Sequence, residues 1–186
     1  MSHYSRNHAP RVYLETERLV LRGWTSADRP GFASLNRDPE VMRYFPAPLS
    51  ESESDALLTR IEQGLERQGY GLFAATEKTN GGFLGFIGLN RATFKSDFTP
   101  CVEVGWRLMR AVWGRGFATE GARACLEFAR QELKLPEVYS FTARSNARSI
   151  AVMRRIGLNF AGEFDHPDVD ANNPLRRHVL YRTDWT

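Results

Sequence analysis

Two glycines flank an arginine directly before a segment with helical periodicity. Gly114, Arg115 and Gly116 precede the segment 116–133, whose apolar residues fall on one helical face. A helix N-terminus carries unpaired backbone N–H groups and the positive end of the macrodipole, so it attracts anions. Glycine allows a phosphate to approach those groups closely. The stretch predicts either a pyrophosphate-binding loop or a tight turn that needs glycine only for its backbone conformation.

Two common phosphate-binding motifs do not fit this stretch. A P-loop requires Gly-Lys-Ser/Thr after its four-residue spacer, whereas Gly121 is followed by Ala122 and Arg123. The dinucleotide-binding motif requires a small residue three positions after its second glycine, where this chain has Thr119. A different kind of phosphate loop is therefore needed if the turn binds an anion.

Composition excludes several classes of protein. The chain has 186 residues, 42% of them apolar, and a net charge of +3. Its arginines are scattered, so we expect no nucleic-acid partner. No apolar run is long enough to span a bilayer, so we expect no membrane association. The histidines lack zinc-binding spacing, so we expect no metal. Cys101 and Cys125 lie in apolar contexts, which favours reduced thiols and a cytoplasmic protein.

The order of the expected elements indicates the fold class. Residues 1–11 are expected to be a flexible leader, and residues 12–186 a single domain. Capping boxes at Thr25–Asp28 and Ser50–Glu53 predict two early helices. Strands are expected at 18–24, 70–77, 82–92, 102–109, 136–143, 159–164 and 176–185, and later helices at 116–133 and 145–157. This order predicts a mixed α/β (α+β) sheet with one parallel crossover through the glycine-rich helix. Gly105, inside a strand, predicts a bulge or a close backbone approach.

The segment from Trp113 to Ala118 resembles the acyl-CoA loop of the GNAT N-acetyltransferases. The family pattern is Gln/Arg-x-x-Gly-x-Gly/Ala, and a tryptophan in its first place is typical of the RimJ/RimL-like branch. Further segments resemble that branch in the same order between residues 14 and 185: LETERLVLRGWTSAD, DPEVMRYF, GFLGFIGL, SNARSIAVMRRIGLNFAGEF and LYRTDW. The resemblance implies a GNAT-like fold with a central, mostly antiparallel mixed sheet, a bulged and splayed strand, and helices on both faces.

The resemblance also implies acetyl-CoA as the co-substrate and assigns residues to it. Backbone groups of the loop would bind the pyrophosphate; its residues are Gly114, Arg115, Gly116, Phe117, Ala118 and Thr119. Leu108, Met109 and Arg110 would pair with the pantetheine arm. Asn146 matches the family asparagine that binds the arm, and Ser149 lies on the same helical face. Arg155 would meet the 3′-phosphate or else be a solvated helix charge.

Amide formation requires a neutral amine, so a base is expected near the thioester. Glu103 matches the acidic strand position of the branch and is the candidate base; the alternative is an exposed strand carboxylate. Many members have a tyrosine acid where this chain has Met153, so that acid is absent. By resemblance, Tyr44 and Phe45 would border the acceptor pocket, together with the loop 165–174.

The expected function is transfer of an acetyl group from acetyl-CoA to a primary amine by direct attack. The acceptor would be a protein N-terminus or a small-molecule amine, and the protein a monomer or homodimer. The alternative is a non-catalytic acyl-CoA-binding or regulatory protein, which only the missing tyrosine at Met153 supports.

Overall fold

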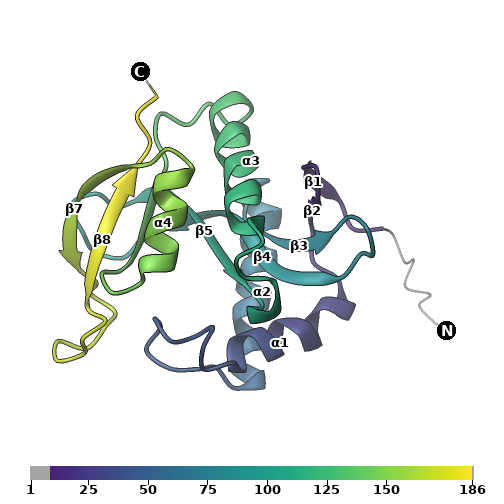
Figure 1. Ribbon diagram of the computed structural model, residues 1–186, viewed down its shortest axis with the longest axis horizontal. Helices are drawn as coiled ribbons and strands as arrows, with labels where there is room; N and C mark the ends of the chain where they lie inside the picture. The colour runs from purple at the N-terminus through teal and green to yellow at the C-terminus, as the bar shows by residue number, and fades with distance from the viewer. Residues whose placement is uncertain (1–8, 186) are drawn as a thin grey trace.

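A computed structural model describes residues 9–185 as an eight-stranded sheet with helices on both faces (Figure 1). The strands are β1 (Val12–Glu15), β2 (Leu19–Arg22), β3 (Leu72–Glu77), β4 (Phe83–Ala92), β5 (Cys101–Leu108), β6 (Tyr139–Ala143), β7 (Asn159–Asp165) and β8 (Arg177–Arg182). The α-helices are α1 (Arg29–Arg37), α2 (Glu51–Gln68), α3 (Phe117–Gln131) and α4 (Ala147–Arg155), with 3-10 turns at Ser26–Asp28 and Arg110–Val112. The strand order is β1-β2-β3-β4-β5-β6-β8-β7. This confirms the expected fold class.

The N-terminal hairpin was not predicted. Residues 1–8 of the expected leader lie outside the described residues, and β1 begins at Val12. β1 pairs antiparallel with β2 and has only four residues, of which both ends are exposed. A strand this short and this exposed carries little of the alternation by which strands are recognised in sequence.

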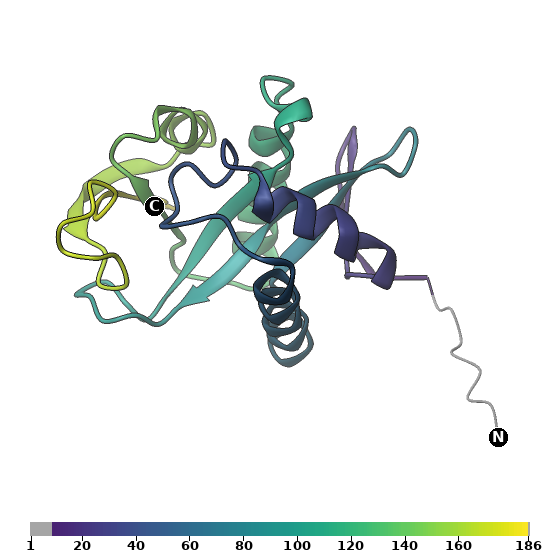
Figure 2. The ribbon, with the colours of Figure 1, turned by 90° about the horizontal axis from the view of Figure 1, so that it is seen from below.

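Alternating residues of β4 direct the two helical layers to opposite faces. Phe86 packs with Phe32 of α1 and Leu58 of α2 on one face. Ile87 packs with the α3 residues on the other, where an added Cβ on Gly121 would lie 2.5 Å from it. This follows from the two-residue period of a strand. Figure 2 shows α2 below the sheet and α3 above it.

Local signals in the sequence set the helix ends as predicted. The Ser50 amide donates to the Glu53 carboxylate at 2.8 Å, and the Glu53 amide donates back to the Ser50 hydroxyl at 3.3 Å. Gly69 ends α2 with a φ of +72°. The Thr25–Asp28 box begins a 3-10 turn that leads into α1. These caps fix the helices that cover the Phe86 face of the sheet.

The feature that positions the site is the separation of β5 from β6. β4 and β5 pair without a register shift from Gly85–Leu108 to Ala92–Cys101, so the bulge expected at Gly105 is not present in this ladder. β5 and β6 run parallel and pair through Glu103 and Tyr139. Beyond that pair β5 continues to Leu108 alone, so the predicted splay begins directly after Glu103.

Two glycines that face each other across β4 and β5 provide a matched stability test. A Cβ on Gly88 would lie 2.1 Å from the Gly71 carbonyl oxygen, whereas a Cβ on Gly105 would meet nothing within 4 Å. Gly88→Ala should lower the free energy of unfolding by about 3 kcal/mol, because the contact is with backbone. Gly105→Ala should change it by less than about 0.5 kcal/mol. Urea unfolding measures both values, and equal destabilisation by the two variants would contradict the packing.

Candidate active site

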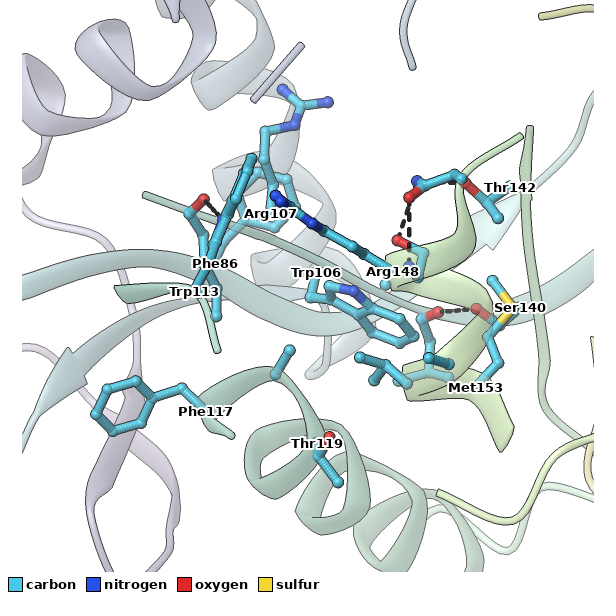
Figure 3. A pocket seen from close by; sticks show the side chains of 18 of the residues that line it. Phe86, Trp106, Arg107, Trp113, Phe117, Thr119, Ser140, Thr142, Arg148 and Met153 are labelled. Atoms are coloured by element: carbon cyan, nitrogen blue, oxygen red, sulfur yellow. Dashed lines mark hydrogen bonds between the residues drawn. The ribbon is translucent and has the colours of Figure 1, made fainter. Parts of the chain in front are cut away.

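A cavity of about 2010 Å³ runs along β5 and across the N-termini of α3 and α4 (Figure 3). It brings together most of the residues predicted from the sequence. Those that line it are Tyr44, Phe45, Glu103, Leu108, Arg110, Gly114, Gly116, Phe117, Ala118, Thr119, Asn146, Ser149 and Arg155. The cavity therefore joins the expected cofactor loop, the expected base and the expected acceptor loop in one space.

Two predicted cofactor residues, Met109 and Arg115, are not part of the cavity wall. The Met109 amide donates to the Leu84 carbonyl at 2.8 Å, on the β4 side of the strand. The Arg115 guanidinium lies 2.9 Å from the Glu77 carboxylate and stacks on the Phe117 ring. The side chain of Arg115 is thus directed at β3, and its charge does not face the cavity in which a phosphate was expected.

The loop glycines satisfy both interpretations of the sequence motif. Gly114 and Gly116 have φ values of +76° and +85°, in the left-handed region where glycine is favoured. Gly116 is the N-cap of α3, and the first amide to bond within the helix is that of Glu120, to the Gly116 carbonyl at 3.0 Å. The preceding amides, of Phe117, Ala118 and Thr119, have no intrahelical carbonyl to bond. They lie at the cavity, as an anion site requires.

Glu120 holds this loop against the N-terminal hairpin. Its carboxylate accepts hydrogen bonds from the Thr16 hydroxyl at 2.5 Å and from the Arg18 amide at 2.8 Å, and it pairs with the Arg18 guanidinium at 2.6 Å. Burial opposes ionisation, but these bonds outweigh it and lower the pKa of Glu120. Glu120 thus supports the loop and stays ionised.

The separated edge of β5 leaves backbone groups facing the cavity. Because N–H and C=O groups of alternate residues point to opposite edges, and the Met109 amide points to β4, those of Trp106 and Leu108 point toward the gap. The Trp113 indole donates to the Leu108 carbonyl at 2.8 Å, and the Ser140 hydroxyl of β6 donates to the Val104 carbonyl at 2.9 Å. The Trp106 backbone and the Leu108 amide are left as the cavity-facing edge, and sequence reasoning missed Trp106.

Asn146 and Ser149 sit at the start of α4, on the other side of the gap. The Asn146 amide nitrogen donates to the Thr142 hydroxyl at 2.9 Å, and its oxygen accepts from the Ser149 amide at 3.3 Å. Asn146 is thus the N-cap of α4. Arg148, next along the helix, reaches across the gap and lies 4.7 Å from the Trp113 ring centroid (Figure 3). This contact bridges the two sides of the opening.

Glu103 is held in an environment that changes its acidity. It is partly buried on β5, its register partner on β6 is Tyr139, and the Asn90 amide donates to its carboxylate at 2.8 Å. Burial raises the pKa of Glu103 to about 7, against the lowering effect of the Asn90 hydrogen bond. A carboxylate with this pKa can exchange a proton near neutral pH.

Three further side chains at the cavity bear on proton transfer. Met153 is buried in the core under the cavity and has no proton to give. His166 and His178, to which the sequence assigned no role, also line the cavity, with ring centroids 5.1 Å apart. Burial lowers the pKa of both, so they are neutral at pH 7. Only the pairing of β8 with β6 brings this hairpin to the site.

Comparison with known proteins agrees with this geometry. The family model described as "Acetyltransferase (GNAT) domain" matches residues 18–159. The chain belongs to the GNAT acetyltransferase family. GNAT domains use acetyl-CoA, and the free amides at α3, the open edge of β5 and the cavity between them fit that co-substrate. Among residues 9–185 no group of His, Cys, Asp and Glu side chains gathers as a metal site, and no helix in this range could cross a membrane.

Relatives of this GNAT chain include characterised and solved proteins. The "FsC-acetyl coenzyme A-N(2)-transacetylase" of Aspergillus fumigatus is 31% identical, covering 92% of this chain and 77% of that protein. The crystal structure of an acetyltransferase from Agrobacterium tumefaciens has a TM-score of 0.75 at 26% identity, covering 98% of this chain and 99% of that one. The RimL ribosomal alpha-N-protein acetyltransferase has a TM-score of 0.78 at 15% identity, with 97% of each chain covered, and shares the fold.

The pKa of Glu103 leads to a pH prediction for this GNAT enzyme. If Glu103 acts as the base, its ionised form is the active one, and kcat/KM should rise with pH through an apparent pKa of about 7. Asn90→Ala removes the hydrogen bond that stabilises the carboxylate, so the rise should move to higher pH. Initial rates of thiol release across pH 5.5–9 measure this. Asn159→Ala, an exposed asparagine on β7, is the control, and a rise at the same pH in Asn90→Ala and Asn159→Ala would contradict the assignment.

Proposed function

We propose that this GNAT acetyltransferase acetylates a primary amine by direct attack, with Glu103 as the general base. The observation that carries the proposal is the position of Glu103. It lies at the cavity, at the point where β5 and β6 separate, and its pKa is about 7. The proposed setting is the cytoplasm, in keeping with two free and buried cysteines.

The proposed binding of acetyl-CoA follows the cavity from α3 to Glu103. The amides of Phe117, Ala118 and Thr119 would receive the pyrophosphate, with Gly114 and Gly116 allowing close approach. The pantetheine arm would pair with the open edge at Trp106 and Leu108 and pass Asn146 and Ser149. Arg155 would lie toward the 3′-phosphate. Acetyl-CoA supplies a thioester whose carbonyl carbon the amine attacks.

The proposed role of Glu103 is to take the proton of the attacking amine. A lysine-like amine has a pKa of about 10.4, so its deprotonation at pH 7.5 costs about 4 kcal/mol, whereas an α-amine costs well under 1 kcal/mol. The new N–C bond replaces the C–S bond, the amine proton passes to Glu103, and solvent protonates the departing sulfur. Solvent has this role because Met153 cannot act as the acid.

The proposed acceptor is a protein N-terminus or a small-molecule amine. The name of the Aspergillus fumigatus relative specifies an N(2) amine, and that of RimL an alpha-N-protein amine. Tyr44 and Phe45 line the cavity in the loop after α1 and are proposed to contact the acceptor. A non-catalytic acyl-CoA-binding protein is the alternative. Thiol release with any amine of a broad panel would exclude it.

Glu103→Gln tests the base directly. The variant should lower kcat by about 10²–10⁴-fold at pH 7 on a high-pKa amine, with the KM for acetyl-CoA nearly unchanged. The loss should shrink at higher pH, where bulk solvent supplies the neutral amine. Glu132→Gln, at the exposed end of α3, is the control. Activity of Glu103→Gln within twofold of wild type at pH 7 would end the assignment.

Glu103→Gln should also change how the stability of the protein depends on pH. The folded-state pKa of Glu103 lies above its ordinary value of 4.5, so the stability that Glu103 contributes is present below pH 4.5 and is lost as pH rises through about 7. Glutamine does not ionise. Glu103→Gln should therefore gain stability relative to wild type between pH 5 and pH 8, measured as the difference in urea midpoint. A difference that does not change with pH would show that Glu103 is not desolvated.

The phosphate-binding role of the α3 loop is tested by removing the phosphates from the co-substrate. S-acetylpantetheine keeps the thioester and the arm but lacks the pyrophosphate. Two charge-assisted hydrogen bonds contribute about 3 kcal/mol, so kcat/KM should be lower by about 100-fold or more. Thiol release with one fixed amine measures both values. Equal kcat/KM for acetyl-CoA and S-acetylpantetheine would show that the glycines serve only the turn.

A further inference from the structure

Arg107 is a charged side chain of the cavity that the proposed reaction does not use. Its Nη1 donates to the Asn36 side-chain oxygen, and its guanidinium carbon lies 4.1 Å from the ring centroid of Phe45 and 5.3 Å from that of Phe86. Its Nε is shielded from solvent and has no hydrogen-bond partner within residues 9–185. Burial lowers the pKa of Arg107 to about 10, so the side chain keeps its charge at neutral pH.

This cation has no carboxylate partner in the described part of the chain. Among residues 9–185 no carboxylate lies within ion-pair distance of Arg107. Glu40 lines the same cavity but pairs with Arg43. Arg107 is half-buried, and a charge withdrawn from water in this way is normally paired with an opposite charge that offsets its desolvation cost. An arginine fork with free donors is suited to a planar carboxylate.

The strand places this cation on the same side as the base. Glu103, Gly105 and Arg107 alternate along β5, so their side-chain directions share one face. The Cα atoms of Glu103 and Arg107 are about 13 Å apart at the usual strand rise. Between them a Cβ on Gly105 would meet nothing within 4 Å, so the cavity floor there carries no side chain. A small acceptor lying over Gly105 would have the base at one end and the cation at the other.

We propose that Arg107 forms an anion subsite that binds a carboxylate of the acceptor, so that the enzyme acts on amines that also carry a carboxylate. Asn36, buried in α1, is the positioning residue that holds the guanidinium over Phe86. Phe45 forms the outer side of the subsite. The inference rests on the proposed function, because it assumes that the amine is delivered to Glu103. A free amino acid and a peptide N-terminus with an acidic residue share this chemistry.

The test compares acceptors in pairs with the same carbon skeleton, one with a carboxylate and the other with a carboxamide in its place. The small-molecule pairs are glycine, 4-aminobutanoate and 6-aminohexanoate, each against its carboxamide. The peptide pair is alanyl-glutamate against alanyl-glutamine, both with amidated C-termini. The wild-type enzyme should show a kcat/KM at least about 10-fold higher for the carboxylate member of one pair or more. Preference in the small-molecule pairs identifies a free amino acid, and preference in the peptide pair alone identifies an acidic N-terminus.

Variants assign the preference to Arg107. In Arg107→Gln the ratio of kcat/KM for carboxylate over carboxamide should fall to near 1, and in Arg107→Lys it should be intermediate, because charge is kept and the fork is lost. Arg91→Gln, an exposed arginine on the neighbouring strand, should keep the wild-type ratio. Arg107→Lys keeps the test available if Arg107→Gln does not fold. No preference in wild type, or an undiminished preference in both Arg107 variants, would overturn the proposal.

If the protein does not transfer acetyl groups, no acceptor releases thiol, and the subsite is tested by binding instead. The same pairs of acceptors are then titrated calorimetrically into the complex of the protein with CoA. Tighter binding of the carboxylate member by wild type and by Arg91→Gln, lost in the Arg107 variants, would still support the subsite. Equal affinity for both members, or no binding of either, would overturn it.

Discussion

The separation of β5 from β6 directly after Glu103 is the constraint on which the rest of the structure depends. Adjacent strands of a sheet normally satisfy each other's backbone groups, and here β5 extends several residues beyond its pairing with β6. Two side chains supply some of the hydrogen bonds that β6 does not make. The Ser140 hydroxyl donates to the Val104 carbonyl, and the Trp113 indole donates to the Leu108 carbonyl. The remaining edge, at Trp106, opens into the cavity and gives an extended ligand arm something to pair with.

Because side chains alternate between the two faces of β5, the cavity has two differently lined sides. Val104, Trp106 and Leu108 pack on the α3 face, next to the loop whose amides are free to bind an anion. Glu103 and Arg107 lie on the face covered by α1 and α2. In the proposed mode of binding, the thioester arm enters from the α3 side, passes through the gap and ends beside Glu103. In the proposed mode of binding the acceptor occupies the opposite face, against the aromatic rings of Phe45 and Phe86 and the half-buried guanidinium of Arg107.

Much of this arrangement could be predicted from local signals. Short stretches of sequence determine several features, because the groups involved lie within a few residues of one another. These features are the capping boxes, the glycines of positive φ before α3 and the asparagine that caps α4. The resemblance to the GNAT family pointed to Glu103 as the candidate base and to the residues proposed to bind the co-substrate. Of the two interpretations of Gly105, the bulge is not present in the β4–β5 ladder, and a close approach to the backbone is left, since the space above this glycine is open to the cavity.

The features that sequence did not predict are those made by distant segments. Arg107 is positioned by a hydrogen bond to Asn36 and by the ring of Phe45, both more than sixty positions earlier in the chain. His166 and His178 reach the cavity only because β8 inserts between β6 and β7. The direction of the Arg115 side chain was decided by Glu77 on β3. Each of these depends on strand order, which local periodicity does not encode.

The central claim is that the open edge of β5 receives the pantetheine arm. Amide hydrogen exchange, followed by NMR with and without CoA, tests this residue by residue. The account predicts that saturating CoA slows exchange at the Trp106 and Leu108 amides, together with the first amides of α3, while the Met109 amide, already bonded to Leu84, changes little. Unchanged exchange at Trp106 and Leu108 in protein saturated with CoA would contradict it.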